Sequence, residues 1–508
     1  VYLDPLLSAS YADLGTANIV HPVFRPAAGS PAFVGNDQSV KLVDPGDPFF
    51  TRVCFAGAVG PRPEDDWTQG WTYYDSTGAG RQDLHLPGMP GPRPLQIADN
   101  LNFFGNRLFS ADTNYLVRGF LRVKAGGSLT VPAGTVIFGE RATLGAIIAE
   151  RGGKLLMLGT REAPIIATSD DPPGQQRRGG WGGIWMLGRA ACNCANTAAG
   201  DSCASEGGSI GFFGGSDDHD SSGVLRYVRC EYSGFPISPD NELNSFTFDG
   251  VGDRTVVEYI QAHRGDDDLV EMFGGTVNFK HCIATDGNDD GFDWQMGYRG
   301  KAQFVIVRML ADGLQTDKGI EADNNEFDFD TPNGPRSNPV CSNLTLIGDR
   351  RGGTSFPGCT FGVHLRRGTL GSVVNSVIIN FKKQALNVQN DATFAAACAA
   401  GFPQPAVWCE SASAGVPVHE GALVVSRAMP NPFRSRLTVS FTLPQAAHVQ
   451  VDVYSADGRR VARIADQDMG AGPHAVPWTV EKDVPSGVYF YSVKAGALQA
   501  QGRIVRVD

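Results

Sequence analysis

Acidic residues recur at fixed positions beside one apolar residue in the stretch 255–323. The motifs are DDLVE at 267–271, DDGFD at 289–293 and DKGIE at 317–321. Carboxylate oxygens are the ligands that hard cations such as Ca²⁺ prefer, and a suitably spaced pair of carboxyl groups can also act as a general acid and base. This stretch is therefore the first candidate for a metal or catalytic site.

The three motifs align on Val270, Phe292 and Ile320, at spacings of 22 and 28 residues. Self-similarity at such a period is typical of solenoids and propellers. Fainter copies extend the series to six rungs, with Phe246 before it and Val363 and Leu386 after it. We assign the longer gap before Val363 to an inserted loop.

Stacking of the rungs would bring the acids into two files. Equivalent residues of consecutive rungs lie about 4.8 Å apart in a parallel β-helix. One file contains Asp267, Asp289 and Asp317, and the other contains Glu271, Asp293 and Glu321. Period-two alternation turns the second file outward. Like charges at this separation repel by about 1 kcal/mol in water, and by several times more where water is excluded, so a neutralising partner is expected.

Three interpretations of the files remain open. Calcium suits an oxygen-only donor set, and its candidate ligands are Asp267, Asp289, Asp317, Glu271, Asp293, Glu321 and Asp290. Alternatively, the acids cap turn amides or pair with cations such as Lys318. A catalytic role would require acid and base work by Asp289 and Asp290 with a third carboxylate. We favour a non-catalytic role and assign no catalytic residue.

Aromatic and histidine side chains near the acids give little further support to catalysis. Trp294 and Tyr298 could stack on sugar rings as exposed aromatics, or could equally pack between rungs. His263 and His281 fall at or beside strand positions, and we interpret them as structural. The pectin-hydrolase signature NTD…GHG…RIK is absent.

The composition predicts an all-β extracellular protein. The chain has 508 residues, 63 Gly and 31 Pro, and its short apolar segments are rich in β-branched residues. A net charge of −11 argues against a nucleic-acid partner. No apolar run reaches the roughly 18 residues that a membrane-spanning helix needs. The chain begins at Val1 without an apolar leader, which we interpret as a processed form.

Ten cysteines in a loop-rich chain indicate an oxidising compartment. Cys230 and Cys282 align with Ala262 and Val307 in one small apolar column, and we expect them to be free core thiols. The zinc pattern CxCx8C is incomplete because no fourth ligand follows it. Seven of the other eight cysteines fall in three groups whose pairing stays open: Cys192, Cys194 and Cys203; Cys341 and Cys359; Cys398 and Cys409.

Motifs across residues 115–390 resemble those of a group of secreted, largely uncharacterised bacterial repeat proteins. These motifs include SGVLRYVR, PDNELNSFTFDGVG and DDGFDWQMGYRG. The resemblance implies a right-handed parallel β-helix over residues 111–390, but no particular activity. Residues 1–110 are irregular, and we expect them to cap the first rung or to extend onto a neighbouring molecule.

The C-terminal part follows a linker at 391–422 and resembles the Ig-like sorting modules of type IX secretion. Its motifs are MPNPFR, VDVYSADGRRV and PSGVYFYSVKAG, within residues 423–508. Independently of the resemblance, its period-two alternation predicts a small β-sandwich. The resemblance implies export to the extracellular space or cell surface.

These observations predict an extracellular structural or adhesive protein that self-assembles into an oligomer, filaments or arrays. The expectation of self-assembly comes from the two open ends of a solenoid, which need caps or partners. The alternative is a β-helix that binds or cleaves polysaccharides, with a glycan as its partner.

Overall fold

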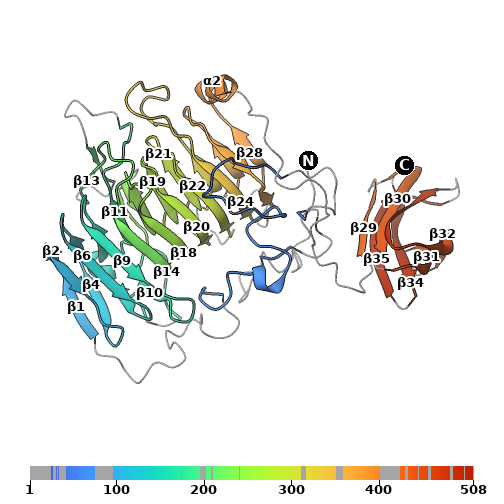
Figure 1. Ribbon diagram of the computed structural model, residues 1–508, viewed down its shortest axis with the longest axis horizontal. Coiled ribbons are helices and arrows are strands. Elements are labelled where there is room, and N and C mark those ends of the chain that lie inside the picture. The colour runs from blue at the N-terminus through green and yellow to red at the C-terminus, as the bar shows by residue number, and fades with distance from the viewer. Residues whose placement is uncertain are drawn as a thin grey trace. The chain divides into compact units, whose positions relative to one another are not determined.

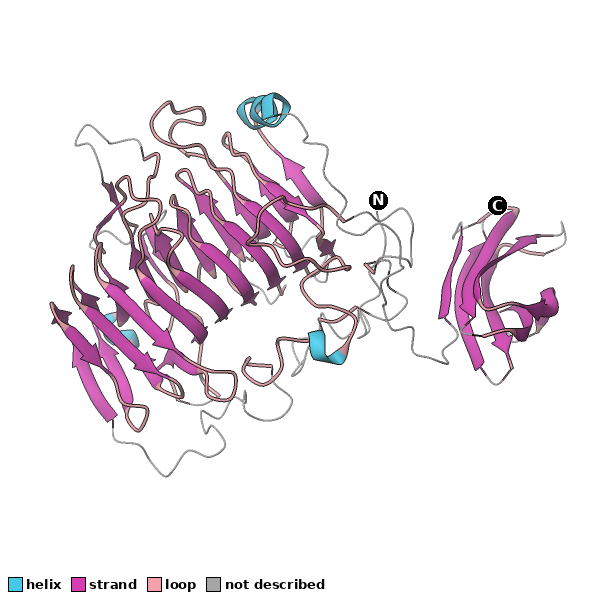
Figure 2. Cartoon of the chain, viewed as in Figure 1, coloured by secondary structure: helices cyan, strands magenta, loops and turns pink. Residues whose placement is uncertain are grey.

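In the computed structural model the regular secondary structure of the described residues is nearly all strand, with one short α-helix, α2 (Asp391–Ala400) (Figure 2). It also has two 3₁₀ turns, η1 (Pro63–Asp65) and η2 (Arg141–Thr143). The structure describes residues 24–26, 30, 32–33, 42–74, 95–172, 174–194, 202–206, 210–238, 241–310, 316–350, 358–400, 424–429, 433–443, 445–455, 459–480, 484–496 and 498–506.

Parallel strands wind into a β-helix with three faces, which confirms the predicted architecture (Figure 1). The first face begins with β3 (Asn106–Leu108), β6 (Ser128–Pro132) and β9 (Lys154–Leu158). The second begins with β1 (Leu95–Asp99), β4 (Asn114–Arg118), β7 (Val136–Gly139) and β10 (Ile165–Ser169). Parallel strands therefore start at Leu95, ahead of the expected boundary at residue 111.

From β14 onward, single long strands cover both of these faces. The first half of β14 pairs with β9 and the second half with β10. The long strands are β14 (Gly223–Glu231), β18 (Val256–His263), β20 (Asn278–Thr285), β22 (Lys301–Arg308) and β24 (Val340–Ile347), and β24 pairs with both β26 (Ser372–Val374) and β27 (Val377–Ile379).

The third face carries the acidic motifs. Its strands, in order across the sheet, are β2 (Asn102–Phe103), β5 (Phe120–Val123), β8 (Ala146–Ala149), β11 (Ile184–Leu187), β17 (Phe246–Asp249), β19 (Val270–Phe273), β21 (Phe292–Gln295), β23 (Lys318–Ala322), β25 (Phe361–Leu365) and β28 (Gln384–Val388). Their inward side chains join those of the other faces in one continuous apolar core.

Each long strand bends at one residue of left-handed conformation, where the first face turns into the second. Four of these bends are aromatic, at Tyr227, Tyr259, His281 and Phe304, with φ between 50° and 59°. Such backbone costs about 1–3 kcal/mol per residue. The rings stack at centroid distances of 4.4, 4.4 and 5.0 Å, and stacking of this kind offsets part of the cost.

The described part of the N-terminal segment lies against this aromatic column, and the expectation that the segment caps the first rung stays a prediction. Trp71 and Val59 pack in one cluster with Ile283 and Ile306. The amide of Thr51 also bonds to the Gln303 side chain on β22 at 2.8 Å. An outward apolar stripe runs along β20 and β22, and burying it accounts for this placement.

The free-thiol prediction for Cys230 and Cys282 is confirmed, although their alignment was wrong by two residues. Both are unbridged and buried. Cys230 lies opposite Ala262, whereas Cys282 lies opposite Ile260. Ala284 occupies the place that we assigned to Cys282.

The C-terminal part is a β-sandwich with its own core (Figure 1). One antiparallel sheet contains β29 (Val424–Met429), β30 (Arg436–Leu443) and β33 (Gly472–Thr479). The other contains β32 (Arg460–Met469), β31 (Ala447–Ser455), β34 (Gly487–Ala495) and β35 (Leu498–Arg506). The Ig-like assignment stays a prediction.

Candidate cation site on the third face

The register of the third face matches the alignment of the acidic motifs. Val270 pairs with Phe292, and Phe292 pairs with Ile320. The series continues on either side to Phe246, Val363 and Leu386, as predicted. The outward file therefore runs through neighbouring strands as Glu271, Asp293 and Glu321.

The outward file faces away from the core but is buried. Glu271, Asp293 and Glu321 are only 4%, 8% and 6% exposed. A hairpin packs on the same side of the sheet, formed by β12 (Cys203–Ala204) and β13 (Phe212–Phe213), with Phe213 against Phe273 of β19. The acids are therefore removed from water, and their mutual repulsion is correspondingly strong.

A further file lies at the turn, two residues before each apolar position, and contains Asp268 and Asp290. Asp268 accepts the amide of Asp290 at 2.9 Å, and Asp290 accepts the amide of Lys318 at 2.6 Å. Each carboxylate thus caps the next rung with one oxygen, as the capping interpretation expects, and the second oxygen is left for another partner.

Lys318 continues this file in the third motif and neutralises one end of the acidic region. Its ammonium group lies 2.6 Å from Asp317, 2.6 Å from Glu321 and 3.5 Å from Asp290. Arg366 adds an ion pair to Glu321. No comparable ion pair from a described Lys or Arg reaches Asp268, Glu271 or Asp293.

Within the part of the chain that the structure describes, several oxygens at the end of the acidic region away from Lys318 lack hydrogen-bond donors. Asn244 and Gln295 both donate their amide groups to Glu271, which leaves Asn244 Oδ1 and Gln295 Oε1 without a partner. Asp293 Oδ1 and Thr247 Oγ1 are also buried and unpartnered. Thr247 pairs with Glu271 in the sheet, so these oxygens surround the same carboxylate. A positive ion is the group that would satisfy them.

The pKa values of these acids are raised, as expected where positive charge is scarce. Burial raises the pKa of Asp268 and of Glu271 well above their ordinary values, and neighbouring carboxylates raise both further. Burial also raises the pKa of Asp290 to about 7, although Lys318 opposes the shift. The pKa of Asp293 is raised by burial too, against the effect of Arg366 and Lys318.

The carboxylate oxygens converge in overlapping trios within 4.8 Å: Asp267, Asp268 and Asp289; Asp268, Glu271 and Asp293; Asp289, Asp290 and Asp317; and Asp290, Asp293 and Glu321. All seven candidate ligands from the sequence belong to these trios. An oxygen-only set with adjustable carboxylates fits Ca²⁺, which takes 6–8 such ligands at about 2.3–2.6 Å. Two of the four trios are fully buried: Asp268, Glu271 and Asp293, and Asp290, Asp293 and Glu321. Lys318 and Arg366 form ion pairs with members of the second trio, whereas no described Lys or Arg forms one with the first.

Some sequence expectations about the site were incomplete or wrong. Trp294 and Tyr298 are each 2% exposed and line the interior of the β-helix, so of the two alternatives packing between rungs is confirmed and stacking on an external sugar is wrong. Asp268, Asn244 and Gln295 were missed as candidate ligands. Asp268 could have been found, because it occupies the same motif position as Asp290. Asn244 occupies that position as well, two residues before Phe246, and Gln295 is in register with Asp249 of β17.

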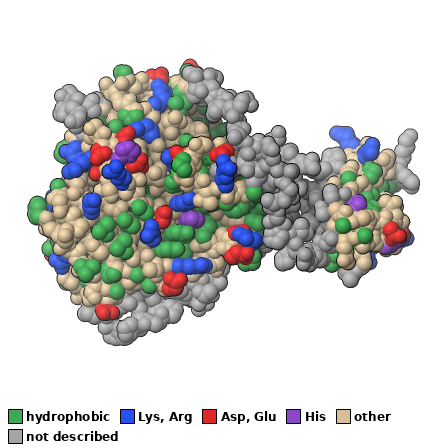
Figure 3. All heavy atoms as spheres, in the orientation of Figure 1, with side chains coloured by type: hydrophobic (Ala, Val, Ile, Leu, Met, Phe, Trp, Pro, Cys, Tyr) green, Lys and Arg blue, Asp and Glu red, His purple; other side chains and the backbone are tan. Residues whose placement is uncertain are grey.

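Charged groups on the visible face of the molecule are mixed in sign. Figure 3 shows Lys and Arg side chains interspersed with Asp and Glu, rather than collected into one basic patch. In the described part of the chain, no helix is both long enough and apolar enough to span a membrane.

Comparison with known families finds one matching domain in each of the two parts of the chain. A secretion-system C-terminal sorting domain matches residues 427–507, so the protein is secreted to the cell surface or the extracellular space. No curated protein and no solved structure matches the chain. A pectate-lyase-like β-helix domain matches residues 103–405, which is more than half of the sequence. The chain therefore belongs to the pectate-lyase-like β-helix family.

Proposed function

We propose that this secreted protein is a calcium-dependent structural or adhesive component of the cell surface. In this proposal Ca²⁺ occupies the trio of Asp268, Glu271 and Asp293 and links neighbouring rungs of the β-helix. The proposal rests on two observations together: three buried carboxylates that form no ion pair with a described Lys or Arg, and oxygens of Asn244 and Gln295 that have no hydrogen-bond partner among the described residues.

The burial of the trio favours a structural cation over a catalytic one. A lyase or hydrolase must bring its carboxylates or its cation against a polymeric substrate, whereas Glu271 and Asp293 lie under side chains of the protein itself. A cation at this position would connect β19 with β21 and with the turn before β19. It would therefore act on rigidity and folding rather than on a bound chain.

Thermal unfolding with and without Ca²⁺ tests this function. At a free Ca²⁺ concentration of 100 times Kd, binding adds about 2.7 kcal/mol to the free energy of unfolding. We expect Ca²⁺ to raise the Tm of the β-helix after chelator treatment and Mg²⁺ to raise it less, because Mg²⁺ requires a stricter octahedral geometry. A Tm that does not respond to chelator or to Ca²⁺ would leave amide capping as the role of the acids.

Self-assembly into filaments or arrays is the part of the proposal that concerns cell-surface architecture. Electron microscopy of the purified protein in Ca²⁺ and in chelator tests it directly. Ordered assemblies that depend on Ca²⁺ would support a structural role, and monomers in both conditions would contradict it.

Family membership also favours a second candidate, recognition or cleavage of an acidic polysaccharide. Lyase cleavage would produce an unsaturated sugar with ultraviolet absorbance, hydrolysis would shorten the chain, and binding alone would retain the protein on immobilised glycan without turnover. Failure of all three across a broad panel of acidic glycans would remove this candidate.

A further inference from the structure

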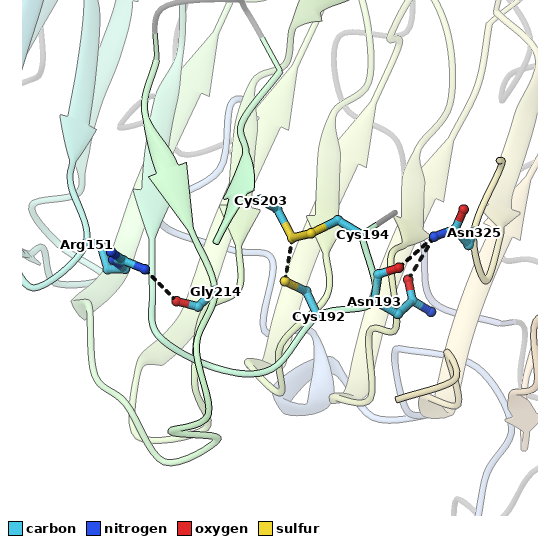
Figure 4. Close-up of a disulfide and its surroundings, with 7 residues drawn as sticks. All are labelled: Arg151, Cys192, Asn193, Cys194, Cys203, Gly214 and Asn325. Atoms are coloured by element: carbon cyan, nitrogen blue, oxygen red, sulfur yellow. Dashed lines mark hydrogen bonds between the residues drawn. A yellow bond between two sulfur atoms is a disulfide. The ribbon is translucent and has the colours of Figure 1, made fainter. Parts of the chain in front are cut away.

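Three cysteine sulfurs meet beside the covering hairpin (Figure 4). Cys194 and Cys203 form a disulfide, and the free thiol of Cys192 lies 2.6 Å from the sulfur of Cys203. Because two of the sulfurs are bonded to each other, the trio offers only one thiolate and is not a zinc site. A free thiol in contact with a disulfide is instead the arrangement that thiol–disulfide exchange requires.

The backbone around Cys192 is anchored on both sides. The amide of Ala191 donates to Asp218 Oδ1 at 3.0 Å, and the amide of Asn193 donates to the carbonyl of Met296 at 2.9 Å. Asn325 donates its side-chain amide to the carbonyl of Asn193 at 2.7 Å (Figure 4). These bonds hold the Cys192 thiol at the disulfide.

Packing and hydrogen bonds hold Cys203 in place as well. It lies in β12, where it pairs with Phe213 of β13. Two residues further on, the amide of Ser205 donates to the carbonyl of Gly211 at 2.9 Å, and its hydroxyl donates to Asp249 Oδ2 at 2.5 Å. Cys203 is thus fixed between two possible partners, separated from it by 9 and 11 positions in the sequence.

We propose that Cys203 is a shared exchange centre whose disulfide passes between Cys194 and Cys192. The Cys192 thiol gives its proton to solvent, and the resulting thiolate attacks Cys203 Sγ. A Cys192–Cys203 bond forms as the Cys203–Cys194 bond breaks, and the electron pair goes to Cys194 Sγ, which takes up a proton. One disulfide and one thiol are present before and after, so no oxidant or reductant is consumed.

The exchange moves the free thiol between two positions while Cys203 stays bridged. The β12–β13 hairpin over the acidic face therefore keeps its covalent anchor in either state. Burial raises the pKa of the Cys192 thiol to about 11, which keeps the thiolate scarce at neutral pH. Exchange should consequently accelerate about tenfold for each pH unit between 7 and 10.

Peptide mapping tests the exchange directly and does not depend on the calcium proposal. No Lys or Arg lies between Arg189 and Arg226, so one tryptic peptide, residues 190–226, carries all three cysteines. Purified protein would be incubated at pH 7 or pH 9, then alkylated with N-ethylmaleimide in acidic urea to label the free thiol. After reduction, iodoacetamide would label the bridged pair, and fragment ions would locate each label.

The expected result is N-ethylmaleimide on Cys192 in some molecules and on Cys194 in the others, with the distribution reached faster at pH 9. Label confined to a single cysteine at both pH values would overturn the proposal, as would label on all three.

Two variants give an independent measurement. Cys194→Ser should form the Cys192–Cys203 bridge, and the matched control Cys192→Ser should keep Cys194–Cys203. A Cys194→Ser protein with a native circular dichroism spectrum but two alkylatable thiols would also overturn the proposal. If that variant does not fold, the wild-type mapping still decides the question.

Discussion

Replacing Asp293 with Asn tests whether the acids of the third face repel one another when no cation is bound. Asp293 belongs to two of the carboxylate trios, with Asp268 and Glu271 on one side and Asp290 and Glu321 on the other. Asn keeps the shape of the side chain but removes its charge. If the site lacks positive charge, the substitution should stabilise the chelated protein, which is unusual for a change at a buried residue.

The expected gain in stability can be estimated from the spacing of the carboxylates. Two unit charges separated by 4.8 Å, the outer limit of the trios, repel by about 3.5 kcal/mol at an effective dielectric constant of about 20. Protonation relieves part of this repulsion, so we expect a gain of about 1–3 kcal/mol in chelator. For a domain of this size, that corresponds to a Tm increase of roughly 2–6 °C.

In Ca²⁺, the stability advantage of Asp293→Asn over the wild type should be smaller than in chelator. Loss of one carboxylate ligand that raises Kd tenfold removes about 1.4 kcal/mol of Ca²⁺-dependent stabilisation. The Ca²⁺-induced rise in Tm should therefore be smaller in Asp293→Asn than in the wild type. Calorimetry in chelator and over a series of Ca²⁺ concentrations measures both effects.

A matched control is Asp218→Asn, because Asp218 pairs with Arg299 at 2.8 Å in a partly exposed ion pair away from the trios. It should lower stability by at most about 1 kcal/mol, equally in chelator and in Ca²⁺. A lower Tm of Asp293→Asn in chelator would refute the electrostatic reasoning and would indicate that Asp293 is held by hydrogen bonds instead.

Three further predictions concern the same balance of charge. In chelator, carboxyl groups such as Asp249 and Asp290, whose pKa is raised to about 7, keep protons that the unfolded chain loses near pH 4. Stability should therefore fall as pH rises from 4 to 7, by about 1.4 kcal/mol per pH unit for each such group, and urea titrations in saturating Ca²⁺ should show a shallower slope. Lys318→Gln leaves the carboxylates around it without their buried partner and should destabilise the chelated protein by about 3–5 kcal/mol, with partial recovery in Ca²⁺ visible by urea unfolding. Arg308→Met breaks the buried pair with Asp286 on the second face and should cost a similar amount, with calorimetry giving the same loss in Ca²⁺ and in chelator.

The repeat alone was enough to predict the register of the acidic strands. Val270, Phe292 and Ile320 are large apolar residues at one position of similar motifs, so the alignment had a single solution. The column that contains Cys282 was harder to align, because a shift of two residues keeps every side chain on the same face of its strand. The left-handed bends at Tyr259 and His281, which fix the true register, leave no trace in the alternation.

Burial was predicted less well than register. Trp294 lies two positions after Phe292, so alternation alone places it in the core with Phe292 and could have decided between the two alternatives left open for it, sugar stacking and packing between rungs. The cover over Glu271 could not be predicted in the same way. A hairpin more than 50 residues earlier in the chain packs on the same side of β19, with Phe213 against Phe273, and no local pattern connects the hairpin with Glu271.

The candidate cation site ends, on either side, at the rung where the repeated acidic residue is replaced by a residue of another type. Along the outward file, Thr247 precedes the acids and His364 follows them. Along the turn file, the same position changes from an amide at Asn244 to carboxylates and then to the ammonium group of Lys318. Unpartnered oxygens therefore collect at the end near β17, whereas protein cations neutralise the end near β23. A bound cation is consequently expected between β17 and β21, where the described residues supply ligands but no Lys or Arg in an ion pair with them.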